Sequence, residues 1–212
     1  MHARLKTGTW LSLAPTLAAR ADKWRATVEF TVTQTIAAPR EQVLEVLVDP
    51  GYYRYLGAQS TTVQAPELLS ASDEGGTIST RVRYAFNGTL SGPAALVVDV
   101  DKLTWVIETN FDPMTHTGTL VVVPDHYEGM LRCHGTLTLH AGDGAGDGDG
   151  DGAGDGDDDE HEDGVTVETV SGRLEVRVPL VSRSAEQAIF GGFRRHLEVE
   201  AAAMADYCSR VR

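Results

Sequence analysis

The feature that most limits the possible folds is a long run of strand-like segments without a helix between them. From residue 58 to residue 180, several segments alternate apolar and polar residues, which is the period of half-buried strands. Turn signals such as Glu74-Gly75-Gly76 and Asn87-Gly88 separate these segments. Because consecutive strands without crossover helices pair with their neighbours, the pattern predicts an antiparallel meander.

Helices are predicted on both sides of this run. The segment TVEFTVTQTIAAP alternates as a first strand, and APREQVLEVLVDPGYYRYLG after it reads as two short helices. Residues 184–212 read as one long amphipathic helix. Its apolar stripe comprises Ala185, Ile189, Phe193, Leu197, Ala201, Met204 and Cys208.

Two stretches carry a family resemblance. TQTIAAPREQVLEVLVDPGYYRYLG resembles the opening of the START-like superfamily, also called SRPBCC or polyketide cyclase-like. GRLEVRVPLVSRSAEQAIFGGF resembles the sheet-to-helix junction of a mostly bacterial branch, a domain of unknown function, and Trp105 also suits that branch. A glycine-containing turn is expected where this chain has VSRSAEQ, which leaves the start of the last helix open.

The resemblance implies an α+β helix-grip fold, in which a curved antiparallel sheet wraps around a long C-terminal helix. A short helix pair follows the first strand. We therefore expect a single domain over residues 26–210, interrupted by an acidic Gly/Asp-rich low-complexity loop over residues 141–164. Residues 1–25 are expected to be a disordered extension, and the protein is expected to be cytoplasmic.

The charge of the chain is concentrated in the acidic loop. Nine Asp and two Glu between residues 141 and 164 account for −11 of the formal net charge of −13. The remaining chain is nearly neutral, so its composition does not indicate the positively charged surface that nucleic-acid binding needs. No apolar segment of the sequence is long enough for membrane insertion.

Within the loop, five aspartates and Gly152 match positions of a calcium-binding EF-hand loop. Position 8 of that loop is Gly154 rather than an apolar residue, and the twelfth position is Asp rather than Glu. Because a Gly-Asp repeat produces the match easily, we interpret the segment as a tether and expect no metal. The weak calcium candidates are Asp147, Asp149, Asp151, Asp155 and Asp158.

Other chemistry-bearing residues show no catalytic pattern. The two cysteines, Cys133 and Cys208, lie far apart and are interpreted as small buried hydrophobes. His134 and His140 are predicted to point outward from a strand. His196, beside Leu197 at the edge of the stripe, is interpreted as a surface residue that could reach a cavity.

The resemblance implies binding of a hydrophobic small molecule or lipid in a cavity between the sheet and the C-terminal helix. No family active-site residue can be carried over, and no cofactor is expected. The alternatives are a cyclase- or hydratase-like enzyme using Gln34, His196 or Tyr84, and an interaction module using the acidic loop. The same inward residues could equally form a filled core. The candidates for the cavity wall are Phe30, Gln34, Tyr84, Phe86, Trp105, Ile107, Phe111, Phe193, Leu197 and Met204.

The side chain of Gln34 lies on the apolar face of the first strand. A buried amide most often satisfies a neighbouring backbone group, and this is the preferred interpretation. The alternative is that the amide points into the cavity.

Overall fold

The computed structural model describes residues 26–61, 63–64, 66–87, 89, 98–142, 164–177 and 183–211. The side chains of residues 26, 74 and 183–189 are excepted. Three predicted features therefore lie outside the described residues or side chains. They are the N-terminal extension, the five aspartates that are calcium candidates, and the start of the C-terminal helix.

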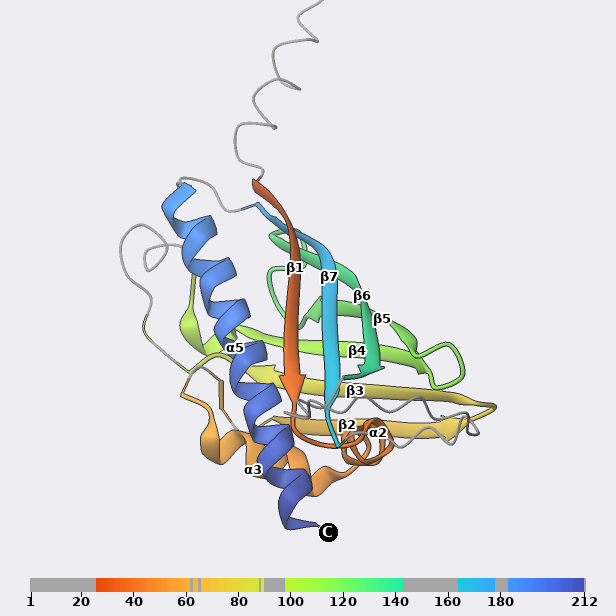
Figure 1. The fold of residues 1–212 in the computed structure, drawn as a ribbon. Coiled ribbons are helices and arrows are strands. Elements are labelled where there is room, and N and C mark those ends of the chain that lie inside the picture. Colours follow the sequence, from red (N-terminus) through yellow and green to blue (C-terminus); the bar gives the residue numbers. More distant parts are fainter. Residues whose placement is uncertain are drawn as a thin grey trace, which may run out of the picture.

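In the part of the chain that the structure describes, seven antiparallel strands form one sheet in the order β1-β7-β6-β5-β4-β3-β2. Each strand from β2 to β7 pairs with the next one along the chain, and β7 then pairs with β1. The strand direction turns strongly across the sheet, which gives it a concave face (Figure 1). The strands are β1 (Ala26–Ile36), β2 (Glu67–Glu74), β3 (Thr77–Ala85), β4 (Thr104–Asp112), β5 (Thr117–Pro124), β6 (Leu131–Ala141) and β7 (Thr166–Val176).

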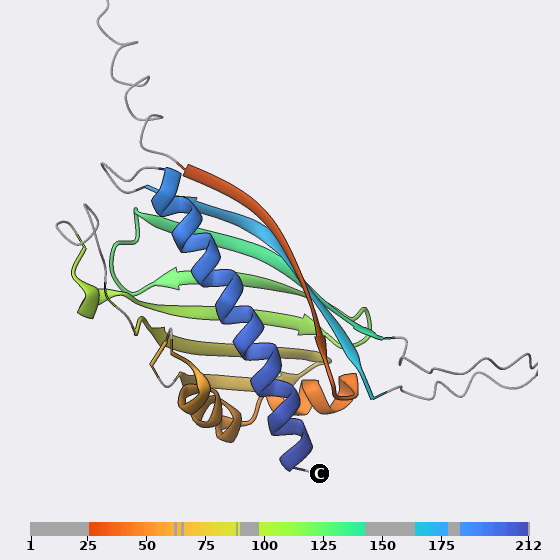
Figure 2. The same cartoon turned by 60° about the vertical axis from the view of Figure 1, so that its left-hand side comes forward.

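The long helix α5 (Arg183–Arg210) crosses the concave face of the sheet, as both views show (Figures 1 and 2). Helices α2 (Arg40–Leu47) and α3 (Pro50–Gln59) lie at one end, and α3 packs against α5. The 3-10 turn η2 (Val100–Lys102) precedes β4. This arrangement confirms the predicted helix-grip fold.

A cap at the start of α3 joins the helix pair to α5. Asp49 accepts a hydrogen bond from the backbone N–H of Gly51 at 2.7 Å and one from the Tyr207 hydroxyl at 2.6 Å. These two bonds, led by that from Tyr207, lower the pKa of Asp49. A Cβ on residue 51 would collide with the Tyr207 hydroxyl, which explains the glycine at this position.

The predicted turn at Gly75 and Gly76 is present and joins β2 to β3. Both glycines have positive φ, 65° and 79°, as a two-residue hairpin of the type I′ class requires. Strand β2 itself, ELLSASDE, has no clear alternation in the sequence. It is an edge strand with exposed residues on both faces, so burial imposes little pattern on it.

The core lies between the concave face and the three helices. It includes Phe111 and Leu139 from the sheet, Tyr52 and Leu56 from α3, and Met204 from α5. Both cysteines, Cys133 and Cys208, are buried, as the sequence predicted.

Phe30 packs across the sheet over a glycine of the neighbouring strand. Gly172 pairs with Phe30 on one side and with Gly135 on the other. A Cβ on Gly172 would lie 2.5 Å from the carbonyl oxygen of His134 and 2.9 Å from Cζ of Phe30. The strongly bent centre of the sheet therefore depends on glycine here.

We expect Gly172→Ala to lower the free energy of unfolding by about 2 kcal/mol, because the added methyl group forces strands or the Phe30 ring apart. Urea denaturation would measure the loss. Gly129→Ala is the control, since no atom lies within 4 Å of its added Cβ. Equal stability of the two variants would show that the sheet accommodates a side chain at residue 172.

Candidate functional site

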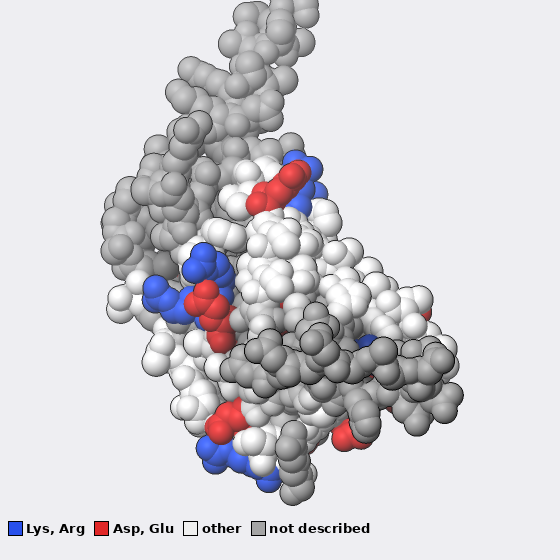
Figure 3. Space-filling view, viewed as in Figure 1, with Lys and Arg blue, Asp and Glu red and all other residues white. Residues whose placement is uncertain are grey.

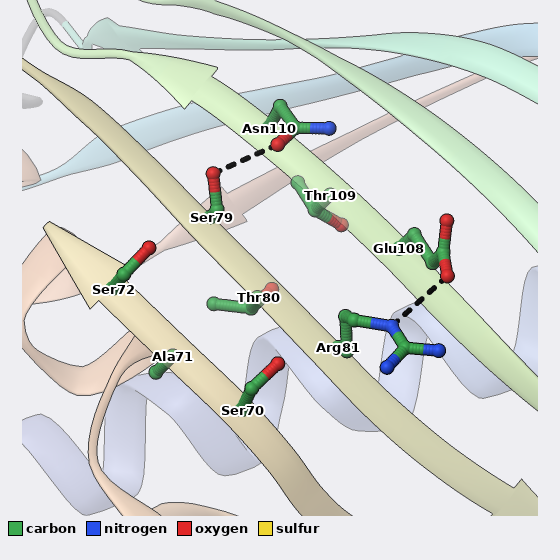
Figure 4. Close-up of a pocket in the computed structure, with 9 residues that line it drawn as sticks. All are labelled: Ser70, Ala71, Ser72, Ser79, Thr80, Arg81, Glu108, Thr109 and Asn110. Atoms are coloured by element: carbon green, nitrogen blue, oxygen red, sulfur yellow. Dashed lines mark hydrogen bonds and ion pairs between the residues drawn. The ribbon is translucent and has the colours of Figure 1, made fainter. Parts of the chain in front are cut away.

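The convex face of the sheet has two shallow depressions lined mostly by polar residues. One, of about 180 Å³, lies over β2, β3 and β4 (Figure 4). Four of its polar side chains form two pairs: Ser79 donates to Asn110 at 2.8 Å, and Arg81 donates to Glu108 at 3.0 Å. The second depression, of about 570 Å³, is open to solvent and lies over Gly135 and Gly172. Neither depression has the enclosed apolar character of a small-molecule site.

Charges on the outer surface are mixed. On the face shown in Figure 3, Lys and Arg lie beside Asp and Glu in small groups. Two exposed ion pairs on α5 likewise place opposite charges side by side: Arg194 with Glu198, and Arg210 with Asp206. The part of this face that the structure describes therefore gives no extended patch of one sign.

A group of polar side chains lies instead between the concave face and α5. The Tyr84 hydroxyl on β3 donates to Oε1 of Glu200 on α5 at 3.1 Å. The Tyr52 hydroxyl on α3 donates to the backbone carbonyl of Glu200 at 3.2 Å. Nε2 of His196, one helical turn before Glu200, lies 3.8 Å from Oε2 of that carboxylate. Three separate elements thus converge on one residue.

His196 is buried, with 6% of its surface exposed. The surface interpretation drawn from the sequence is therefore wrong, because the curvature of the sheet covers the edge of the helical stripe. Its ring packs edge-on against Tyr84, with centroids 5.2 Å apart. Neither ring nitrogen has a hydrogen-bond partner among the described residues.

The side chain of Gln34 on β1 also has a buried polar atom. Its Nε2 atom makes no hydrogen bond within the described part of the chain, so the preferred interpretation, a bond to a neighbouring backbone group, is not met by that atom. Glu168 on β7 is its partner in the strand register.

Glu168 lies in phase with Thr166 and Val170, both of which are buried on the concave face. Burial, followed by the charge of Glu200, raises the pKa of Glu168 to about 8. The carboxyl is therefore mostly protonated at neutral pH. The same causes, with burial first, raise the pKa of Tyr84 far above its ordinary value.

The ten candidates for the cavity wall divide into two sets. Phe30, Tyr84, Phe111, Leu197 and Met204 are buried and belong to the core, whereas Gln34, Phe86, Trp105, Ile107 and Phe193 are only half-buried. Phe30 meets Phe193 edge-on at 5.0 Å, and Tyr84 stacks on Trp105 at 6.1 Å. Phe86 lies just beyond β3, in an isolated bridge with Val63, and is not part of the core cluster.

Glu168 and Glu200 are absent from the residues selected by sequence, although a signal for each was present. Glu168 stands in phase with Val170 and Leu174, two positions of the inward face of β7. Glu200 lies four residues before Met204, on the apolar stripe of the helix. A carboxylate in phase with an apolar face is the pattern that identifies both.

Comparisons with known proteins support the fold. A family model described as "Protein of unknown function (DUF2505)" matches residues 31–208. No curated protein sequence matches the chain. Among solved structures, the aromatase/cyclase Zhui from Streptomyces sp. R1128 is 16% identical, with a TM-score of 0.54 over 88% of this chain and 97% of that chain.

Two further structures are similar. A protein from Thermus thermophilus is 14% identical, with a TM-score of 0.55 over 87% of this chain and 99% of that chain. A START superfamily protein from Mycobacterium smegmatis is 12% identical, with a TM-score of 0.47 over 87% and 99%. At these identities the likeness shows the fold alone, and the two structures with TM-scores of 0.54 and 0.55 agree with the predicted helix-grip fold. None of the described helices is long and apolar enough to cross a membrane.

Proposed function

The chain belongs to the DUF2505 family, and we propose that it binds a small, largely apolar molecule between the concave face of its sheet and helix α5. The observation that carries this proposal is that three buried polar atoms of two residues on the sheet and on α5 lack hydrogen-bond partners among the described residues: Nε2 of Gln34 and both ring nitrogens of His196. An unsatisfied buried polar group costs about 1–3 kcal/mol. A ligand with a polar group at this place would satisfy them.

The apolar surroundings support the same function. Trp105 and Ile107 lie on the concave face of β4 but remain half-buried. They pack against the core without being enclosed by it. A ligand would bury this remaining apolar surface, and each Å² so buried contributes about 25 cal/mol. In contrast, the enclosed Phe111 has no surface left for a ligand.

A second candidate function is acid–base catalysis by the same polar group. Glu168, whose pKa is raised to about 8, would hold a proton at neutral pH, and Glu200 is linked to Tyr84 by a hydrogen bond. A carboxyl group that holds a proton near a second, hydrogen-bonded carboxyl suits proton transfer to a bound molecule. An interaction role for the acidic loop is a prediction that falls outside the described residues.

Binding would be tested with the neutral fluorescent probe N-phenyl-1-naphthylamine. We expect the native protein to enhance its emission. Ile107→Trp is expected to weaken probe binding at least tenfold, because the larger ring fills the half-buried space on the concave face. Titration of the probe into each variant measures the effect.

Val121→Trp is the matched control, since Val121 lies on the neighbouring strand, is 42% exposed and faces the convex side. It should leave probe binding unchanged. Absence of probe binding by the native protein, or equal weakening by both tryptophans, would contradict a site on the concave face.

A further inference from the structure

We propose that the ligand carries a protonated amine joined to an apolar body, an inference that rests on the proposed function and names its ligand class. Two carboxyl side chains, Glu168 from β7 and Glu200 from α5, face the interior between sheet and helix. Among the described residues, no Lys or Arg lies on the concave face of the strands. The described strands therefore present acceptors for a cation to the interior but no Lys or Arg.

The groups around the two carboxyls do not supply the missing charge. Tyr52, Tyr53 and Tyr84 surround them, and burial raises the pKa of each phenol, so all three stay neutral. His196 is the one basic side chain facing Glu200, at 3.8 Å, and no ion pair joins it to Glu168 in the described chain. The raised pKa of Glu168 is the expected response of a carboxyl that lacks a counter-ion.

The unpartnered groups fit the hydrogen-bonding needs of an ammonium. A primary ammonium has three donors and no acceptor. Glu168 and Glu200 offer two acceptors, and a ring nitrogen of His196 that has no partner among the described residues is a third group in reach of the ligand. The amide of Gln34 can turn so that its oxygen faces the ligand, since the two orientations differ only in hydrogen bonding.

Aromatic rings beside the carboxyls favour the same class. Tyr84 and Trp105 are stacked, with an interplanar angle of 10°, and Trp105 remains half-buried. A cation over an aromatic face gains cation–π attraction, and an alkyl or aryl body would cover Ile107 beside them. A metal ion fits less well, because calcium and magnesium take six or more oxygens and the described side chains form no group of three metal-ligand residues.

The test uses ligands that differ only in their head group. Decylamine, decanol and decanoate form one set, and 4-phenylbutylamine, 4-phenylbutanol and 4-phenylbutanoate form another. Isothermal titration calorimetry at pH 7 is expected to show at least tenfold tighter binding of an amine than of the alcohol with the same body. The binding enthalpies measured in phosphate and in Tris buffer should differ by the amount expected for the release of about one proton, because Glu168 ionises beside the ammonium.

Glu168→Gln should remove the preference for the amine and its proton release, while binding of the alcohol persists. Glu29→Gln, which changes an exposed carboxyl on β1, is the matched control and should keep the preference. Equal or tighter binding of the alcohol or the acid would overturn the inference and leave the proposed function intact. Binding of N-phenyl-1-naphthylamine without binding of either amine would likewise overturn the inference and leave the proposed function intact. Absence of binding by every probe, including N-phenyl-1-naphthylamine, would overturn both.

Discussion

Glu168→Gln is expected to stabilise the protein increasingly as the pH rises, by about 3 kcal/mol more at pH 8 than at pH 5. In the folded protein, burial and the charge of Glu200 raise the pKa of Glu168 from its ordinary value of 4.5 to about 8. The folded state therefore binds a proton that the unfolded chain releases between these two pH values. By linkage, this carboxyl lowers stability as the pH rises through that window.

The size of the effect follows from the width of the window. Each pH unit between the two pKa values changes the free energy of unfolding by about 1.4 kcal/mol per group. The partial exposure of Glu168 reduces the total below the ideal value, to about 3 kcal/mol. Below pH 4.5 the carboxyl is protonated in both states, and the contribution vanishes.

Urea denaturation of both proteins at pH 5, 6.5 and 8 would measure the difference. Glutamine resembles a protonated glutamate in shape, so any cost of the amide itself is the same at every pH. Glu29→Gln is the control, and its effect should stay within about 0.5 kcal/mol throughout. A difference between Glu168→Gln and the native protein that does not change with pH would contradict the raised pKa of the Glu168 carboxyl.

Phe111→Ala is expected to lower the free energy of unfolding by about 4 kcal/mol. The ring of Phe111 has 0% of its surface exposed and lies over Gly118, whose added Cβ would come within 3.0 Å of it. Its neighbour across the sheet, Ile78, is also buried. Removing a buried phenyl ring costs about 3–5 kcal/mol, since the surroundings refill the space only in part.

The same variant separates core from ligand contact. Met114→Ala, three residues further along, removes a side chain that is 86% exposed and should cost less than about 0.5 kcal/mol. Folded Phe111→Ala should bind N-phenyl-1-naphthylamine as the native protein does. A small loss of stability together with weakened probe binding would instead place Phe111 in the ligand site.

The main elements of the fold were predictable because each is recorded in a local pattern. The alternation of β1, β3 and β4 reflects burial of one face, and the stripe of α5 reflects burial of one side of a helix. The glycine pair at the β2–β3 turn is required by positive φ. Strand β2 was not predicted, because an exposed edge strand places little demand on its side chains.

The site was predicted only in part. Trp105, Ile107 and Phe111 were identified correctly as lying on one face of a strand. The alternation of the strand could not, however, distinguish the enclosed Phe111 from the half-buried Ile107. That difference depends on where α5 crosses the sheet, and residues far apart in the chain determine it.

The sequence alone determined the faces of the strands and the stripe of the long helix, because these follow from local periods of burial, whereas the helix-grip fold was implied by the family resemblance of its motifs. Only the tertiary structure decided that Glu168, Glu200, Tyr84 and His196 share one interior. These residues lie on two separate strands and a helix, and no local sequence pattern shows that these elements meet. Burial of a charge and the lack of a partner are properties of the assembled interior, and these two properties carry the proposed function.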